Sequence, residues 1–286
     1  MPYLQELLTR IHMPQEASGV ILAAAEKIPP RELADAADAF FSGSEIREEI
    51  GAISEKTGMP FETVTLCVLM LLSERTKADY QAAGWPENLF YDTMSDFTVW
   101  AKTGMRANGS WGIPRENDWW LRKHLRMELV RLGRMQFEPS TFQLDEYHGR
   151  TMDLRRGDPV LNCHIPQGEP FTKELRHDSY TRAVDFFGRN LFAVETWFLY
   201  PVHRQILKPT SNIIGFMDEF TTLHTEVYPD NNDLWRVFGF LDDYSPEKLP
   251  RETSLQRAYA DHLAKTGETG GGYGIMLFEN GRCVQP

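Results

Sequence analysis

The stretch Pro159-Val160-Leu161-Asn162-Cys163-His164-Ile165 decides how the C-terminal half of this chain folds. It is a short, mostly apolar run that ends at Pro166-Gln167-Gly168, which is typical of a buried β-strand. Thr172 follows as a helix N-cap, with Glu174 near the positive end of the helix, and apolar residues then recur at helical spacing as far as Phe187. The sequence therefore predicts a strand, a turn and a helix.

A second apolar segment runs from Phe192 to Tyr200, directly after this helix. The order strand, helix, strand predicts a parallel pair of strands joined by a right-handed crossover. Ligands bind at the carboxyl ends of such strands, so we expect a site where the two segments end.

The rest of the C-terminal half continues to mix strands and helices. Met135 to Glu138 alternates as a half-buried strand should. Asn280-Gly281 predicts the turn of a β-hairpin between Tyr273 to Phe278 and Arg282 to Val284. The other expected elements are a helix capped by Ser211 or Asn212 that reaches Phe220, strands at Leu223 to Tyr228 and Trp235 to Phe238, and a helix near Ser254 to Leu263.

The preceding half has only helical patterns. Pro29-Pro30 interrupts the first helices, and Phe61 to about Ala83 is apolar on more than one face, as in a buried helix. Leu121, Leu125, Leu129 and Leu132 lie on one face of a helix that we expect to end near Gly133. A chain of 286 residues exceeds what one core usually organises, so we predict a helical domain at residues 1–133 and a mixed sheet flanked by helices at 134–286.

The composition limits the classes of partner. The net charge of −11 repels phosphate backbones and anionic lipids, so we expect neither nucleic acid nor a membrane as partner. The basic residues from Arg122 to Arg126, with Arg131 and Arg134, are interpreted as a solvated helix face. No apolar run reaches the roughly 20 residues of a membrane span, and the start of the chain lacks a signal-peptide pattern. Three scattered cysteines suit a reducing compartment, so a cytoplasmic location is expected.

Three segments of the C-terminal half carry a family resemblance. Leu161 to Pro166, Thr196 to Pro201 and Ser211 to Phe216 are similar to the C-terminal domain of the GNAT-like N-acyltransferases. The helical half, ending in Leu132 to Phe137, resembles the N-terminal domain that accompanies it. The resemblance implies a GNAT-like fold that transfers an acyl group from an acyl thioester of the acyl-CoA type to a small amine.

In GNAT enzymes two central strands splay apart to admit pantetheine, and the following turn holds the pyrophosphate. The resemblance thus makes Cys163, Ile165, Gln167 and Gly168 the expected cofactor-binding residues. It is compatible with a homodimer, and no cluster of His, Asp or Glu has metal-site spacing, so no metal is expected. The turn lacks the usual glycine-rich loop, which favours an alternative function, a GNAT-shaped ligand-binding or protein-interaction module without catalysis.

Acyl transfer requires a base, an oxyanion donor and an acid for the thiolate. Glu195 lies in an apolar strand, where burial would make it a stronger base, although a position at a solvent-exposed edge or in a structural ion pair is the alternative. His164 ends its strand on the same face as Asn162 and could relay a proton, or it could bond to backbone. Tyr200 could protonate the thiolate or cap the core.

Two further features have structural interpretations. Cys163 is expected to be a packing residue and not a nucleophile. Gly270-Gly271-Gly272 precede a strand, whereas phosphate loops precede a helix, so we expect a flexible turn there.

Overall fold

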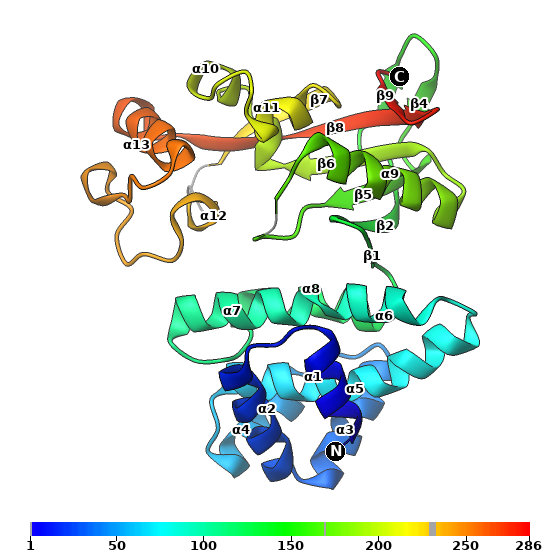
Figure 1. Cartoon of the computed structure of the whole chain (residues 1–286), viewed down its shortest axis with the longest axis vertical. Helices are drawn as coiled ribbons and strands as arrows, with labels where there is room; N and C mark the ends of the chain where they lie inside the picture. The colour runs from blue at the N-terminus through cyan, green and yellow to red at the C-terminus, as the bar shows by residue number, and fades with distance from the viewer. Residues whose placement is uncertain (1, 169, 229–232) are drawn as a thin grey trace. The chain divides into compact units, whose positions relative to one another are not determined.

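The computed structural model describes residues 2–168, 170–228 and 233–286 (Figure 1). The chain divides into two compact units, one of residues 1–131 with 166–168 and one of residues 132–165 with 169–286. Among the helices of the described residues, none combines the length and the apolar character that crossing a membrane requires.

The first unit consists of helices around one central helix. That helix, α5, is buried without interruption from Thr63 to Met70, because its apolar residues surround the axis and other helices cover all sides. The predicted buried helix is thus confirmed, and so is the break at Pro29-Pro30, which separates α2 from α3. The helices are α1 (Pro2–Arg10), α2 (Gln15–Lys27), α3 (Pro30–Phe41), α4 (Arg47–Thr57), α5 (Phe61–Ala82), α6 (Glu87–Met94), α7 (Asp96–Asn108), η1 (Arg115–Asn117) and α8 (Asp118–Leu125).

The prediction of one helix through Leu132 is wrong. Helix α8 ends at Leu125, and Met127 takes a left-handed conformation with φ of 58°, which an α-helix does not tolerate. The following residues Val130–Leu132 form strand β1. The leucine spacing therefore reflects burial of two different elements and not one helical face.

The basic group around α8 is not a solvated face, contrary to expectation. Arg122, Arg131 and Arg134 are all buried. Arg122 donates from Nη2 to Oδ2 of Asp118 at 2.7 Å, and Arg134 donates from Nε to the carbonyl of Pro170 at 2.9 Å. Burial of these charges is tolerated because each guanidinium has oxygen acceptors nearby.

The second unit is a mixed sheet in the order β1-β2-β5-β6-β8-β7, with β9 paired to β8 (Figure 1). Strands β5 and β6 are parallel neighbours, as predicted from the helix between them. A separate pair, β3 and β4, lies outside this sheet. The strands are β1 (Val130–Leu132), β2 (Met135–Thr141), β3 (Glu146–His148), β4 (Asp153–Arg155), β5 (Pro159–His164), β6 (Leu191–Thr196), β7 (Thr221–Tyr228), β8 (Thr269–Glu279) and β9 (Arg282–Val284).

The crossover helix α9 covers one face of this sheet. Its Tyr180 ring contacts the rings of Phe137 in β2 and Phe192 in β6, with centroids 6.4 and 5.3 Å apart. The opposite face of the sheet buries a second apolar cluster, which includes Val160, Leu191, Ala193, Tyr273 and Ile275. The helices of the unit are α9 (Lys173–Phe187), η2 (Trp197–Leu199), α10 (His203–Ile206), α11 (Asn212–Met217), α12 (Trp235–Phe238), η3 (Pro246–Lys248) and α13 (Ser254–Thr266).

Local signals correctly predicted several elements of this unit. Thr172 accepts from the N–H of Leu175, and Ser211 accepts from that of Ile213, so both predicted caps are confirmed. The hairpin is confirmed as well, since Asn280 and Gly281 have φ of 51° and 74° between β8 and β9. In contrast, the strand from Phe192 stops at Thr196 and becomes a 3-10 turn, and the strand expected at Trp235 to Phe238 is helix α12.

The glycine run is not a flexible turn, which corrects our expectation. Gly270, Gly271 and Gly272 lie inside β8 and are buried. A Cβ added at Gly270 would be 2.3 Å from the carbonyl oxygen of Glu226, and one at Gly271 would be 2.0 Å from the hydroxyl of Tyr228. A residue larger than glycine therefore has no room at these two positions, because the carbonyl oxygen and the hydroxyl lie directly against the strand.

Candidate functional site

The parallel strands β5 and β6 pair over only two positions. Leu161 is opposite Phe192, and Asn162 is opposite Ala193. Beyond these positions the described residues of β5 still pair with β2, and those of β6 still pair with β8, but the two strands no longer pair with each other. The strands thus separate toward their carboxyl ends, a geometry in which an extended ligand can hydrogen-bond to strand edges.

A histidine and a carboxylate meet where this separation begins. Nε2 of His164 lies 2.9 Å from Oε1 of Glu138, and Nδ2 of Asn162 donates to the same oxygen at 3.2 Å. The His164 and Glu138 side chains are 22% and 12% exposed, so the pair is sheltered from solvent but accessible. Because a carboxylate only accepts, we assign the imidazole proton to Nε2.

This arrangement suits proton transfer. With the proton on Nε2, the basic lone pair is on Nδ1, and Glu138 stabilises the positive charge that forms when Nδ1 takes up a proton. The sequence analysis had placed His164 and Asn162 on one face, and their side chains are indeed 3.2 Å apart.

Glu138 was missed in the sequence analysis. It comes from β2, which pairs antiparallel with β5 so that Glu138 is opposite Asn162. Side chains directly opposite in neighbouring strands share a face, which brings the carboxylate to the histidine. The alternation from Met135 to Glu138 indicated a strand, but only its register with β5 reveals the contact.

Glu195 lies on the same face of the sheet as His164. It is two residues beyond Ala193, the partner of Asn162, and alternate residues of a strand share a face. The side chain of Glu195 is exposed near the end of β6, which agrees with a position at a solvent-exposed edge and not with burial as a strengthened base. Across the sheet it is opposite Tyr273 in β8.

Tyr200 lies on the other face. Its ring lies against the Gly270 position of β8. Gly271 and Tyr273 belong to the face of the sheet that carries Glu195, and Gly270 belongs to the opposite face because residues alternate along a strand. Burial raises the pKa of the Tyr200 phenol, and the negative charge of Glu268 adds to this effect. The structure therefore does not place Tyr200 beside His164 and Glu195.

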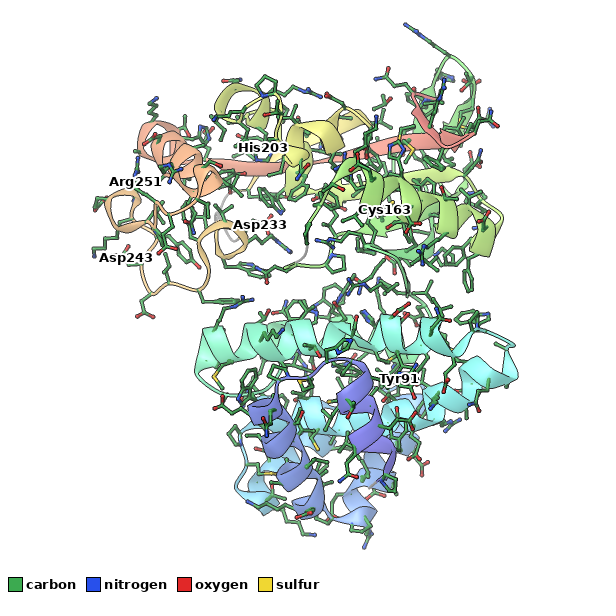
Figure 2. All side chains as sticks on the ribbon, in the orientation of Figure 1. Tyr91, Cys163, His203, Asp233, Asp243 and Arg251 are labelled. Carbon is green, nitrogen blue, oxygen red and sulfur yellow. The ribbon has the colours of Figure 1, made fainter. Side chains whose placement is uncertain are left out.

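The four expected cofactor-binding residues have different surroundings. Cys163 is buried in β5 (Figure 2), where burial raises the pKa of its thiol well above the usual range, consistent with a packing residue. Ile165 is half-buried directly after β5, and Gly168 is exposed with φ of 99°. Gln167 belongs to the helical unit, where its side-chain oxygen accepts from Nη2 of Arg106 at 3.0 Å.

The N-terminus of α9 is the nearest helix end after β5. Its first-turn N–H groups and the positive end of the helix dipole favour an anion. A carboxylate already uses this position, because a backbone hydrogen bond and the Thr172 hydroxyl lower the pKa of Glu174. Lys173 adds a positive charge beside it. A bound phosphate would thus compete with the Glu174 carboxylate.

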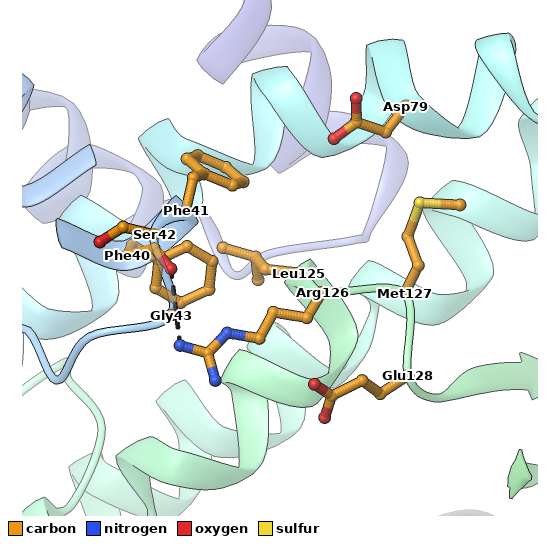
Figure 3. A pocket seen from close by; sticks show the side chains of 9 residues that line it. All are labelled: Phe40, Phe41, Ser42, Gly43, Asp79, Leu125, Arg126, Met127 and Glu128. Carbon is orange, nitrogen blue, oxygen red and sulfur yellow. Dashed lines mark hydrogen bonds between the residues drawn. The ribbon is translucent and has the colours of Figure 1, made fainter. Parts of the chain in front are cut away.

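A pocket of about 410 Å³ lies within the helical unit (Figure 3). It is lined by residues 40–43 at the end of α3, by Asp79 of α5 and by residues 125–128 after α8. Arg126 extends along it, with Nη2 3.5 Å from the carbonyl of Phe40. None of the residues that the sequence analysis assigned to the site lines this pocket.

Family models match nearly the whole chain. Residues 2–127 match the N-acyltransferase N-terminal domain, and residues 129–276 match the GNAT-like C-terminal domain. A search of curated proteins finds no match.

Solved structures with a similar fold exist. One is an acyltransferase in complex with decanoyl-CoA and teicoplanin, with a TM-score of 0.74 and 23% identity over 95% of this chain and 86% of that chain. Another is an acyltransferase in complex with CoA and 10C-teicoplanin, with a TM-score of 0.75 and 22% identity over 96% and 87%. A third is an acyltransferase mutant in complex with octanoyl-CoA, with a TM-score of 0.74 and 22% identity over 96% and 87%.

Proposed function

Because the chain belongs to the family defined by the GNAT-like C-terminal domain, here preceded by an N-acyltransferase N-terminal domain, we propose that it transfers an acyl group from an acyl-CoA to an amine. The observation that carries this proposal is the pairing of His164 with Glu138 at the point where β5 and β6 separate. Acyl transfer requires a base close to the thioester, and an extended thioester would lie in the space where the two parallel strands separate.

The pantetheine arm would extend between the strand ends. Residues after Asn162 in β5 and after Ala193 in β6 offer backbone groups at facing edges, and Ile165 offers apolar contact. The phosphates would be held near the start of α9, with Lys173 as the cation and Glu174 displaced from the helix end. Cys163 would contribute packing beneath the arm.

In the reaction, Nδ1 of His164 accepts a proton as the amine nitrogen attacks the thioester carbon. The new C–N bond forms, the C–S bond breaks, and CoA leaves as a thiolate that takes the proton back from the imidazolium. Glu138 stabilises the imidazolium between these steps. We assign the return of the proton to His164 and not to Tyr200, because the raised pKa of Tyr200 makes the phenol a weaker acid.

Glu195 would attract the acceptor. An amine arrives mostly as an ammonium ion, and the exposed carboxylate of Glu195 on the same face as His164 favours its approach; the ammonium releases its first proton to solvent before the neutral amine attacks. The related acyltransferase complexes contain teicoplanin or 10C-teicoplanin, so we propose that the acceptor is an amine carried by a larger polar molecule.

The test combines binding with turnover. The full chain is mixed with acetyl-CoA, octanoyl-CoA or decanoyl-CoA and a panel of amines that includes a glycopeptide, and acylated product and free CoA are measured by mass spectrometry. We expect equal amounts of amide and CoA, which His164→Gln should abolish and His148→Gln, at an exposed histidine, should leave unchanged. Binding of CoA esters without turnover would instead support the non-catalytic ligand-binding module, and absence of binding would contradict acyl transfer and leave the protein-interaction module.

A further inference from the structure

Three potential metal ligands converge on the α9 side of the C-terminal unit. They are His177 in α9, Glu219 in the segment between α11 and β7, and Cys283 in β9. Nε2 of His177 is 3.5 Å from Sγ of Cys283 and 3.5 Å from Oε1 of Glu219, and all three ligand atoms lie within 4.8 Å of one another. Because these segments are far apart in the sequence, residue spacing alone predicts no metal site.

The two separations that involve His177 match those between ligands of a tetrahedral ion. Zinc binds nitrogen at about 2.0–2.1 Å and sulfur at about 2.3 Å, which in a tetrahedron places two ligand atoms roughly 3.3–3.6 Å apart. A distance of 3.5 Å between Nε2 and a carboxylate oxygen is longer than a normal charge-assisted hydrogen bond. The three ligand atoms thus lie around one position that an ion could occupy, with the third separation, between Sγ and Oε1, at most 4.8 Å.

A second layer of contacts fixes the carboxylate. Arg176 donates to Glu219 from Nη2 at 2.6 Å and from Nε at 2.9 Å, and the hydroxyl of Tyr180 donates to Oε2 at 3.1 Å. Both Arg176 and Tyr180 are fully buried, so the orientation of Glu219 is set by the core. Outer contacts of this kind orient the ligands of metal sites.

We propose that His177, Glu219 and Cys283 form a zinc-binding site with a fourth position open to water. Binding displaces the thiol proton of Cys283 to solvent and forms the thiolate, whose negative charge offsets the opposing cation of Arg176. The ion links β9 to α9 and so ties the last strand to the crossover helix. His177 is 22% exposed on its side chain, which gives the ion access.

The site is separate from the proposed acyl-transfer pair. Cys163, which lies on the α9 side of β5, is close enough for the charges of Glu219 and Cys283 to act on its thiol. Asn162 and His164 alternate with Cys163 and therefore occupy the opposite face. Zinc binding and acyl transfer can thus be tested independently.

The experiment uses the full chain after treatment with a chelator and follows titration with Co²⁺ by absorption. We expect a thiolate-to-cobalt charge-transfer band and tetrahedral ligand-field bands that saturate at one equivalent and disappear when Zn²⁺ is added. Zinc should also raise the melting temperature of the C-terminal unit, and binding should weaken as pH falls because protons compete for the thiolate.

Matched variants identify the ligands. Cys283→Ser and His177→Gln should abolish the cobalt bands, whereas Cys67→Ser in the helical unit and His262→Gln on α13 should keep them. Glu219 is not replaced, because its loss would leave the Arg176 cation buried without its main partner. A folded wild-type chain without a thiolate band at one equivalent of Co²⁺, or a band that survives in Cys283→Ser, would overturn the proposal.

Discussion

Glu138 holds the imidazole of His164 through a contact of 2.9 Å between Oε1 and Nε2, across the antiparallel pair β2 and β5. The two residues belong to different strands, so the geometry of the pair is fixed by the sheet and not by a loop. A pair on rigid strands keeps the direction of the imidazole constant during turnover.

The first prediction follows from this pair. Glu138→Gln keeps the size of the side chain and a hydrogen bond to the imidazole but removes the charge that stabilises the imidazolium. We expect the rate of acyl transfer in single turnover to fall by about 10²-fold. Glu146→Gln, which removes an exposed carboxylate beside His148, should leave the rate unchanged. An equal loss in both variants would show that general charge and not the pair is responsible.

The second prediction concerns Glu195. Because its side chain is exposed, Glu195→Gln should change the melting temperature little, in contrast to the buried ion pair that the sequence also allowed. If Glu195 attracts the ammonium ion, the KM for the amine should rise about 10-fold while kcat with saturating amine stays nearly constant. The control is Glu279→Gln, an exposed glutamate at the opposite end of β8 from the partner of Glu195. A fall in kcat alone would instead make Glu195 part of the proton transfer.

The elements whose boundaries are set by residues close in the sequence could be predicted from the sequence. The unit β5, α9 and β6 was recognisable because Thr172 caps the helix and an apolar face recurs as far as Phe187, so each boundary is set within a few residues. Asn280-Gly281 determines its hairpin in the same local way. In contrast, Trp235–Phe238 has only four residues, too few for a period to distinguish a strand from the helix that forms.

The functional contacts depend on register, which the sequence does not display. Glu138 reaches His164 because β2 pairs with β5 in one particular alignment, and a shift of one residue would turn it to the other face. Likewise, the apolar neighbours of Glu195 in its strand left open whether it is buried or lies at a solvent-exposed edge, and the structure shows that it is exposed. The sequence therefore identified side chains whose chemistry suits the site, but it did not reveal their partners or their exposure to solvent.

The third prediction tests the glycine strand. In Gly270→Ala the new methyl group would meet the carbonyl oxygen of Glu226 at 2.3 Å, so the backbone of β7 or β8 must shift. We expect a loss of about 1–3 kcal/mol in the free energy of unfolding of the C-terminal unit, measured with denaturant. The contrast is Gly19→Ala in α2, where no atom lies within 4 Å and the higher helix propensity of alanine should stabilise the helical unit by up to about 1 kcal/mol. A stable Gly270→Ala variant would mean that β7 adapts without cost.

The last prediction is a loss of stability in acid caused by His203 (Figure 2). The side chain is fully buried, with Nδ1 donating to the carbonyl of Phe198 at 3.1 Å and Nε2 accepting from the hydroxyl of Tyr259. Burial lowers the pKa of His203 from 6.5 to about 4. The unfolded chain therefore binds a proton that the folded chain does not, and stability should fall as pH drops from 6.5 to about 4 by about 3 kcal/mol, with no further loss from this residue below that. Denaturant unfolding at several pH values measures the slope, and His203→Gln, which cannot titrate, should flatten it in that window. An unchanged slope would assign the acid sensitivity to other groups.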